Sequence, residues 1–146
     1  MITNRQKENS STTENEILNI VARQREYFKS GATKSYQGRI ENLSRLKSAL
    51  VKYESEINAA LKQDLGKPAF ETYLSETGFS LLEISETIRK LKSWMKPKWT
   101  LTSLLTQPGS SRIYYSPLGV NLIIAPYNYP ISLTFSPLIA AIAAGN

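Results

Sequence analysis

Residues 120–130 read VNLIIAPYNYP and indicate the fold class of the chain. Residues 120–125 are nearly continuous in apolar side chains, which is typical of a strand buried on both faces of a parallel sheet. Pro130 stands where a helix can begin, because a first-turn proline loses no hydrogen bond that a helix needs. Residues 131–144 complete that helix, with a kink or a restart at Pro137. The stretch therefore predicts the strand–loop–helix opening of a parallel α/β unit.

Four helices are predicted upstream of this unit, because apolar residues recur there at helical spacing. Their start and stop signals are, in chain order, the capping box of Thr13 and Glu16, the stop at Gly31, the start near Ser35, the stop at Gly66, and the prolines at 68 and 97.

The helical pattern ends at Pro97, and residues 98–116 have a different one. Residues 98–111 are expected to form a polar connection with a turn at Pro108 and Gly109. Residues 112–116 read as an edge-like strand. The order of elements predicts an α/β fold whose sheet is incomplete in this chain, since a parallel strand needs neighbours and covering helices. Residues 120–125 and 138–144 would otherwise leave apolar surface and strand edges in water.

Composition excludes several kinds of site. The 146 residues contain no Cys and no His, so a thiol nucleophile, a disulfide and the commonest general base are missing. We expect no metal site, because the usual nitrogen and sulfur ligands are absent. A self-contained active site is therefore not expected, although carboxylates, Lys, Tyr and Ser remain.

The net charge of +6 has two interpretations. Basic residues alternate with Glu along the predicted helices, which favours a solvated helical surface over a nucleic-acid partner. Residues 90–99 are the densest basic and aromatic cluster, and a binder of nucleic acid or of membrane surfaces remains the alternative. Residues 1–7 lack the apolar core of a secretory signal, and prolines interrupt the apolar stretches near residue 130. We expect no transmembrane segment and a cytoplasmic location.

The candidate site is the loop between the predicted strand and helix, because ligands of open α/β sheets bind beyond strand ends. Asn128 has a neutral amide that can donate to a developing oxyanion, or it is simply a turn residue. Tyr127 and Tyr129 are pocket-lining or packing aromatics. Glu76 and Glu83 lie seven residues apart on one helix face, as an acid/base pair or, more commonly, as ion-paired helix residues.

Several motifs resemble the NAD(P)-dependent aldehyde dehydrogenase family. Residues 117–120, 123–130 and 140–146 (PLGV, IIAPYNYP and AAIAAGN) are similar to its cofactor domain. Upstream, residues 64–68 and 94–98 (DLGKP and WMKPK) resemble its class 3, or fatty aldehyde, branch. The motifs occur in the expected order over residues 17–146.

The resemblance implies roles for the residues of the strand end. Asn128 matches the asparagine that stabilises the oxyanion formed when a Cys thiolate attacks the aldehyde. Ile124, Ala125, Pro126 and Tyr127 match the segment beside the nicotinamide and ribose of NAD or NADP. Tyr127 departs from the more usual tryptophan and keeps an aromatic wall.

The resemblance also implies a division of the chain. The polar residues 1–12 are expected to be a disordered terminus, and a helical part follows over 13–111. The resemblance then gives an oligomerisation-sheet strand over 112–117, and over 118–146 the first strand–helix unit of a Rossmann-like cofactor domain. Relatives continue past this point into a cofactor-binding Lys, an activating Glu and the nucleophilic Cys.

We therefore expect an N-terminal fragment of a homodimeric enzyme that oxidises aldehydes, inactive when isolated because it lacks the thiol. A non-enzymatic protein that pairs with a full-length relative through residues 112–116 is the alternative.

Overall fold

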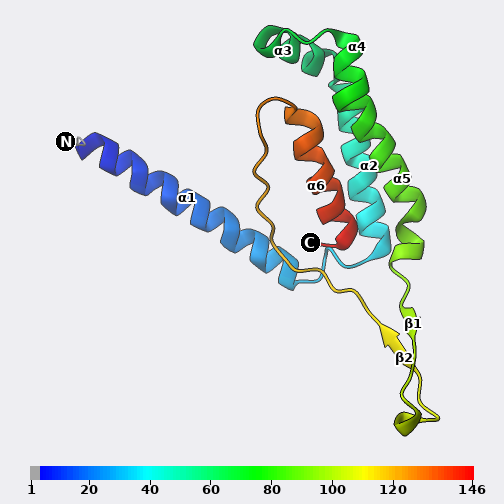
Figure 1. Ribbon diagram of the computed structural model, residues 1–146. Coiled ribbons are helices and arrows are strands. Elements are labelled where there is room, and N and C mark those ends of the chain that lie inside the picture. The colour runs from blue at the N-terminus through cyan, green and yellow to red at the C-terminus, as the bar shows by residue number, and fades with distance from the viewer. Residues whose placement is uncertain (1–3) are drawn as a thin grey trace.

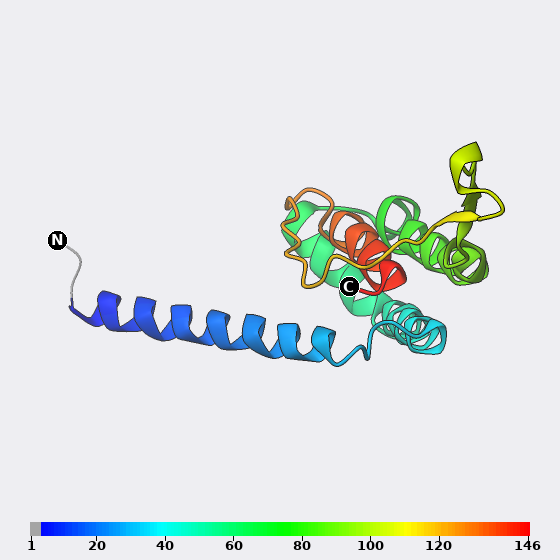
Figure 2. The same ribbon diagram turned by 90° about the horizontal axis from the view of Figure 1, so that it is seen from below.

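The computed structural model describes residues 4–146, with side chains described from residue 14 onward. Figure 1 shows a body of packed helices from which the long first helix and a two-stranded hairpin project in different directions, and Figure 2 shows the same separation. The elements are, in chain order, α1 (Asn4–Lys29), α2 (Tyr36–Lys52), α3 (Glu54–Leu65), α4 (Ala69–Thr72), a π-helical turn (Tyr73–Thr77), α5 (Gly78–Trp94), β1 (Lys98–Thr100), a 3-10 turn (Leu104–Thr106), β2 (Ser111–Ile113) and α6 (Pro130–Ala144).

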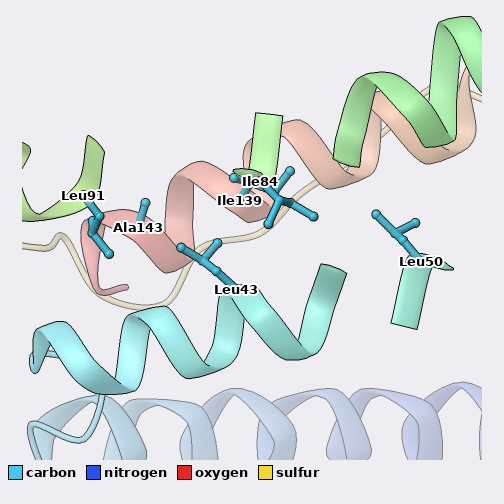
Figure 3. Packing of buried hydrophobic residues seen from close by; sticks show 6 residues of the cluster. All are labelled: Leu43, Leu50, Ile84, Leu91, Ile139 and Ala143. Atoms are coloured by element: carbon cyan, nitrogen blue, oxygen red, sulfur yellow. The ribbon is translucent and has the colours of Figure 1, made fainter. Parts of the chain in front are cut away.

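The core lies between α2, α5 and α6. Figure 3 shows apolar side chains from these three helices pointing toward one another. The cluster consists of Leu43, Leu50, Ile84, Leu91, Ile139 and Ala143. Because α6 lies more than thirty residues after α5 in the chain, this core is what attaches the C-terminal helix to the helical part.

Helix α1 begins earlier than the sequence predicts. The capping-box spacing places the start at Thr13, whereas the structure has helix from Asn4. The prediction of a disordered terminus over residues 1–12 thus differs from the structure over residues 4–12, and residues 1–3 lie outside the described part. Ile17, Ile20 and Tyr27 of this helix are exposed.

The predicted start of α2 and the predicted end of α3 are confirmed. The hydroxyl of Ser35 accepts a hydrogen bond of 3.0 Å from the backbone N–H of Gly38, which caps the start of α2. Gly66 ends α3 in the left-handed conformation.

The predicted fourth helix is present but is not uniform. It follows Pro68 and ends at Trp94, with the π-helical turn between α4 and α5. In this turn the N–H of Gly78 bonds the carbonyl of Tyr73, five residues earlier. A side chain at position 78 would place its Cβ 2.6 Å from that carbonyl oxygen, so the wide turn requires glycine there.

The predicted polar connection contains a strand that sequence reasoning missed. β1 pairs antiparallel with β2, with Lys98 opposite Ile113 and Thr100 opposite Ser111. The guanidinium of Arg112 lies 3.9 Å from the ring centroid of Trp99, a cation–π contact across the pair. The edge strand predicted at 112–116 therefore begins at Ser111 and ends at Ile113.

The predicted buried strand over residues 120–125 is wrong for this structure. Residues 114–126 form an irregular segment with neither helix nor strand, and Leu122 and Ile124 are each 85% exposed. A parallel strand forms only against a neighbouring strand, and the described residues offer none at this position. The apolar run is present in the sequence, but the chain described here contains nothing that pairs with it.

Helix α6 agrees with the prediction at both ends. Pro130 is its first residue, and Gly145 ends it in the left-handed conformation. Pro137 lies inside the helix, and the predicted kink does not divide the helix into two elements. Over residues 4–146, no helix combines the length and the hydrophobicity that crossing a membrane requires.

Candidate functional site

The loop that precedes α6 carries the predicted site residues. Tyr127 is 83% exposed, and Asn128 is exposed as well. Pro130 begins α6 directly afterwards, so Asn128 stands two residues before the helix. The N-terminal end of a helix carries partial positive charge from its free N–H groups, which favours an anion nearby.

Lys67 holds this loop from the helical part of the chain. The side chain comes from the short link between α3 and α4, and the residue is only 8% exposed. Its Nζ donates to the backbone carbonyl of Asn128 at 2.7 Å and to Oε1 of Glu76 at 2.5 Å. Nζ also lies 3.7 Å from the ring centroid of Tyr129. One ammonium group therefore contacts two successive residues of the loop.

Glu76 holds the beginning of α6. It is completely buried in the π-helical turn, and its Oε2 accepts a hydrogen bond of 2.8 Å from the N–H of Ile131. Such an N–H group in the first turn has no partner within its own helix. The carboxylate therefore satisfies that donor, complements the helix dipole and neutralises Lys67.

The prediction that Glu76 and Glu83 share a helix face is consistent with their contacts, since both bond to α6. Oε2 of Glu83 accepts a hydrogen bond of 2.5 Å from the hydroxyl of Ser136. Glu76 instead binds Lys67 and Ile131. The two carboxylates thus have separate partners, which matches the ion-paired and structural interpretation better than an acid/base pair.

The other end of α6 is held by Arg39. The guanidinium donates to the carbonyl of Ala143 at 2.9 Å and to that of Thr33 at 3.2 Å. Burial lowers the pKa of Arg39 from its ordinary value. The hydroxyl of Thr33 donates to the carbonyl of Gly145 at 2.7 Å. The bonds to Ala143 and Gly145 satisfy carbonyls that a helix end leaves free.

The remaining predicted residues lie directly before Asn128, at the end of the irregular segment and in the loop. Ile124, Pro126 and Tyr127 are exposed, and Ala125 is half-buried. The structure places them next to Asn128 along the chain without a sheet to order them.

Sequence reasoning missed Lys67 as a site residue. It lies 61 residues before Asn128 in the sequence, and its motif, DLGKP, indicates the family resemblance but not a contact with the loop. The only local signal for Lys67 is its position in the link between two helices. It directly follows the glycine that ends α3 and directly precedes a proline.

Comparison with known proteins identifies the family. The sequence model of the Aldehyde dehydrogenase family matches residues 5–146. The chain belongs to the aldehyde dehydrogenase family. It is 41% identical over 90% of its length to "Aldehyde dehydrogenase family 3 member H1" of Arabidopsis thaliana. It is 46% identical over 82% of its length to the "4,4'-diaponeurosporen-aldehyde dehydrogenase" of Staphylococcus aureus.

A solved structure of the family has the same arrangement. The structure titled "Substrate bound state of Staphylococcus Aureus AldH" matches 84% of this chain with a TM-score of 0.82 and 45% identity. The predicted resemblance to class 3 aldehyde dehydrogenases and the predicted α/β class are confirmed, since the chain has the N-terminal part of this fold. The chain spans only about a quarter of its relatives, 26–27% of each of the three proteins named here.

Proposed function

We propose that this chain forms the N-terminal segment of a class 3-like aldehyde dehydrogenase, which oxidises an apolar aldehyde to a carboxylic acid with NAD or NADP. The observation that carries the proposal is the placement of Asn128, exposed at the head of α6 with its backbone bound by Lys67. A fixed, neutral amide N–H is the donor that an oxyanion requires, and the helix end adds a favourable potential.

The residues before Asn128 fit one side of a dinucleotide site. Ile124, Pro126 and Tyr127 offer exposed apolar surface beside the amide, and none of them carries a charge. They would hold the nicotinamide and ribose, and the cofactor supplies the hydride acceptor when bound. Tyr127 would provide an aromatic wall.

The proposal assigns the parts of the chain as follows. Residues 13–111 form the helical part, residues 112–117 belong to an oligomerisation sheet, and residues 118–146 begin the cofactor domain. The enzyme would be a cytoplasmic homodimer without a nucleic-acid partner. Two basic side chains, Lys29 and Lys90, support the last point, because each pairs with a glutamate of its own helix.

The isolated 146-residue polypeptide is proposed to be inactive. Its sequence contains no Cys, and hydride transfer in this mechanism follows covalent attack of a thiolate on the aldehyde. The purified polypeptide, incubated with a long apolar aldehyde and either NAD or NADP, should form no NADH or NADPH. Formation of reduced cofactor above the level without protein would contradict this expectation.

A chimera tests the proposed function itself. Residues 1–146 would replace the matching segment of the Staphylococcus aureus enzyme, and the chimera should oxidise aldehydes. Asn128→Ala should lower kcat by about 100- to 1,000-fold, the usual cost of losing one oxyanion donor. The matched control is Asn121→Ala, which changes another exposed asparagine, in the irregular segment 114–126. An inactive chimera that is folded, or equal activity of both variants, would refute the proposal.

One observation favours an interaction protein as the second candidate. Leu104 and Leu105, in the turn between β1 and β2, are 88% and 96% exposed, and Tyr114 and Tyr115 after β2 are exposed too. Large apolar patches on a projecting element mark interaction sites. This candidate predicts that the polypeptide copurifies with a full-length relative and that Leu104→Asp abolishes the association. The fragment interpretation predicts no such association.

A further inference from the structure

Lys67 has a saturated set of contacts. An ammonium group has three N–H donors. Here the nitrogen lies within bonding distance of Oε1 of Glu76 and of the carbonyl of Asn128, and over the ring of Tyr129. With these three contacts and only 8% of the residue exposed, the side chain has little freedom to move.

The ion pair grips the loop at two points. Lys67 binds the carbonyl of Asn128, and the second oxygen of Glu76 binds the N–H of Ile131, three residues later. Between these points lies Pro130, whose ring fixes the backbone angle φ. The backbone from the carbonyl of Asn128 to the N–H of Ile131 is therefore held at both ends by one buried pair.

We propose that Lys67 and Glu76 are positioning residues, which hold the amide of Asn128 where it receives the oxyanion. The inference rests on the proposed function for its catalytic meaning, but not for the geometry. A catalytic donor must be held within about 0.5 Å of its productive position, and supporting contacts provide this precision. Asn128 itself is exposed, and the hydrogen bond that it receives from Lys67 is made to its backbone carbonyl.

The pair is better suited to positioning than to stability. A buried ion pair is weak evidence for stability, because apolar residues of similar volume often replace one without loss. Glu76 also lies in a π-helical turn, a feature that is frequent at functional sites. Replacing both charges with apolar side chains should thus keep the fold and release the loop.

The first experiment uses the whole 146-residue chain labelled with ¹⁵N. The double variant Lys67→Met with Glu76→Leu removes both grips, and Glu76→Gln weakens the attraction while keeping an acceptor for Ile131. We expect hydrogen exchange of the Ile131 amide to accelerate at least about tenfold in the double variant, since its bond is lost. The side-chain amide signals of Asn128, assigned by their loss in Asn128→Ala, should move toward those of a free asparagine.

Glu83→Gln is the matched control. It weakens another carboxylate contact of α5 with α6, the bond from Ser136, yet lies away from the loop. It should leave the Ile131 exchange rate and the Asn128 signals unchanged. If the double variant unfolds, the single variant Glu76→Gln tests the proposal instead. It should change the same Asn128 signals, but by a smaller amount. Unchanged signals in a folded double variant or in Glu76→Gln, or an equal change in Glu83→Gln, would overturn the proposal.

Kinetics in the chimera separates this inference from the proposed function. In the chimera, the double variant Lys67→Met with Glu76→Leu should lower kcat at least about tenfold with little change of KM. The reason is that the contact with the oxyanion is made in the transition state and not in the ground state. Lys67→Arg, which keeps the charge, should recover part of kcat. A loosened loop with unchanged kcat would overturn the catalytic meaning of the pair. An inactive parent chimera would refute the proposed function, and the exchange experiment would still decide whether the pair positions the loop.

Discussion

The two ends of helix α6 are held by buried groups of opposite charge. At the first turn, the carboxylate of Glu76 accepts from the N–H of Ile131. At the last turn, the guanidinium of Arg39 donates to the carbonyl of Ala143. Each charge is opposite in sign to the partial charge of the helix end that it contacts, which is favourable. Together with the apolar core, these contacts attach α6 at both ends to a helical part far away in the sequence.

The two ends differ in what else the charged group contacts. Glu76 pairs with Lys67, which continues to the exposed loop with Asn128. The described hydrogen bonds of Arg39 end on the carbonyls of Thr33 and Ala143, and burial lowers its pKa. The first end therefore connects to the candidate site, whereas the second end has the contacts of a structural anchor.

The largest expected effect is the loss of one member of the buried pair. Lys67→Met leaves the carboxylate of Glu76 fully buried without a cation, which costs about 3–5 kcal/mol of the free energy of unfolding. Urea denaturation followed by circular dichroism measures it. The double variant with Glu76→Leu should recover most of that loss. A single variant that is no less stable than the double variant would contradict this account.

Removing the contacts of Arg39 at the other end of α6 should lower the free energy of unfolding by a smaller amount. Arg39→Met removes charged hydrogen bonds to two carbonyls but keeps much of the apolar stem, so we expect a loss of about 2 kcal/mol. The same denaturation experiment measures it. The Asn128 signals of the labelled chain should not move, because Arg39 contacts the far end of α6. Movement of those signals would remove the distinction between the two ends.

Gly145 sharpens the comparison through a pair of matched substitutions. Gly145 and Gly66 both have positive φ, 86° and 67°. A Cβ at position 145 would collide with the guanidinium of Arg39, whereas a Cβ at position 66 would meet nothing within 4 Å. Gly66→Ala should cost about 1 kcal/mol from backbone strain alone, and Gly145→Ala more. In an Arg39→Met background the excess should shrink, and an undiminished excess would contradict the collision.

Local signals in the sequence predicted several helix ends, although the capping-box spacing at Thr13 did not mark the start of α1. Ser35, Gly66, Pro130 and Gly145 act through their own backbone or that of near neighbours, so the sequence alone was sufficient. Asn128 was predicted from its place between an apolar run and a helix, and the structure leaves its side chain exposed there.

Features that depend on distant partners were not predictable in the same way. Lys67 and Arg39 acquire their contacts only when α6 and the loop before it pack against the helical part. The carbonyl of Asn128 lies 61 positions after Lys67 in the sequence, and the carbonyl of Ala143 lies 104 positions after Arg39. The strand predicted at 120–125 failed for the same reason in reverse, because its apolar pattern presupposes a neighbour that the described residues do not supply. The π-helical turn has one sequence signal, Gly78, which also fits an ordinary helix.

The smallest effect is expected at an exposed ion pair on α5, which tests whether burial or distance determines the contribution of such pairs. Nζ of Lys90 lies 2.5 Å from Oε1 of Glu86, the same distance as in the buried pair, but both side chains are 46% exposed. The hydrogen bond and the charge of Lys90 lower the pKa of Glu86 from its ordinary value of 4.5.

A lowered carboxyl pKa in the folded state stabilises the protein above the unfolded pKa, and this contribution disappears as the pH falls through the folded pKa. Glu86→Gln should thus reduce the melting temperature slightly near pH 7, less in high salt, and not at all near pH 2. If its effect near neutral pH approached that of Lys67→Met, distance rather than burial would determine the strength of these pairs, and the comparison between the buried pair and the surface would fail.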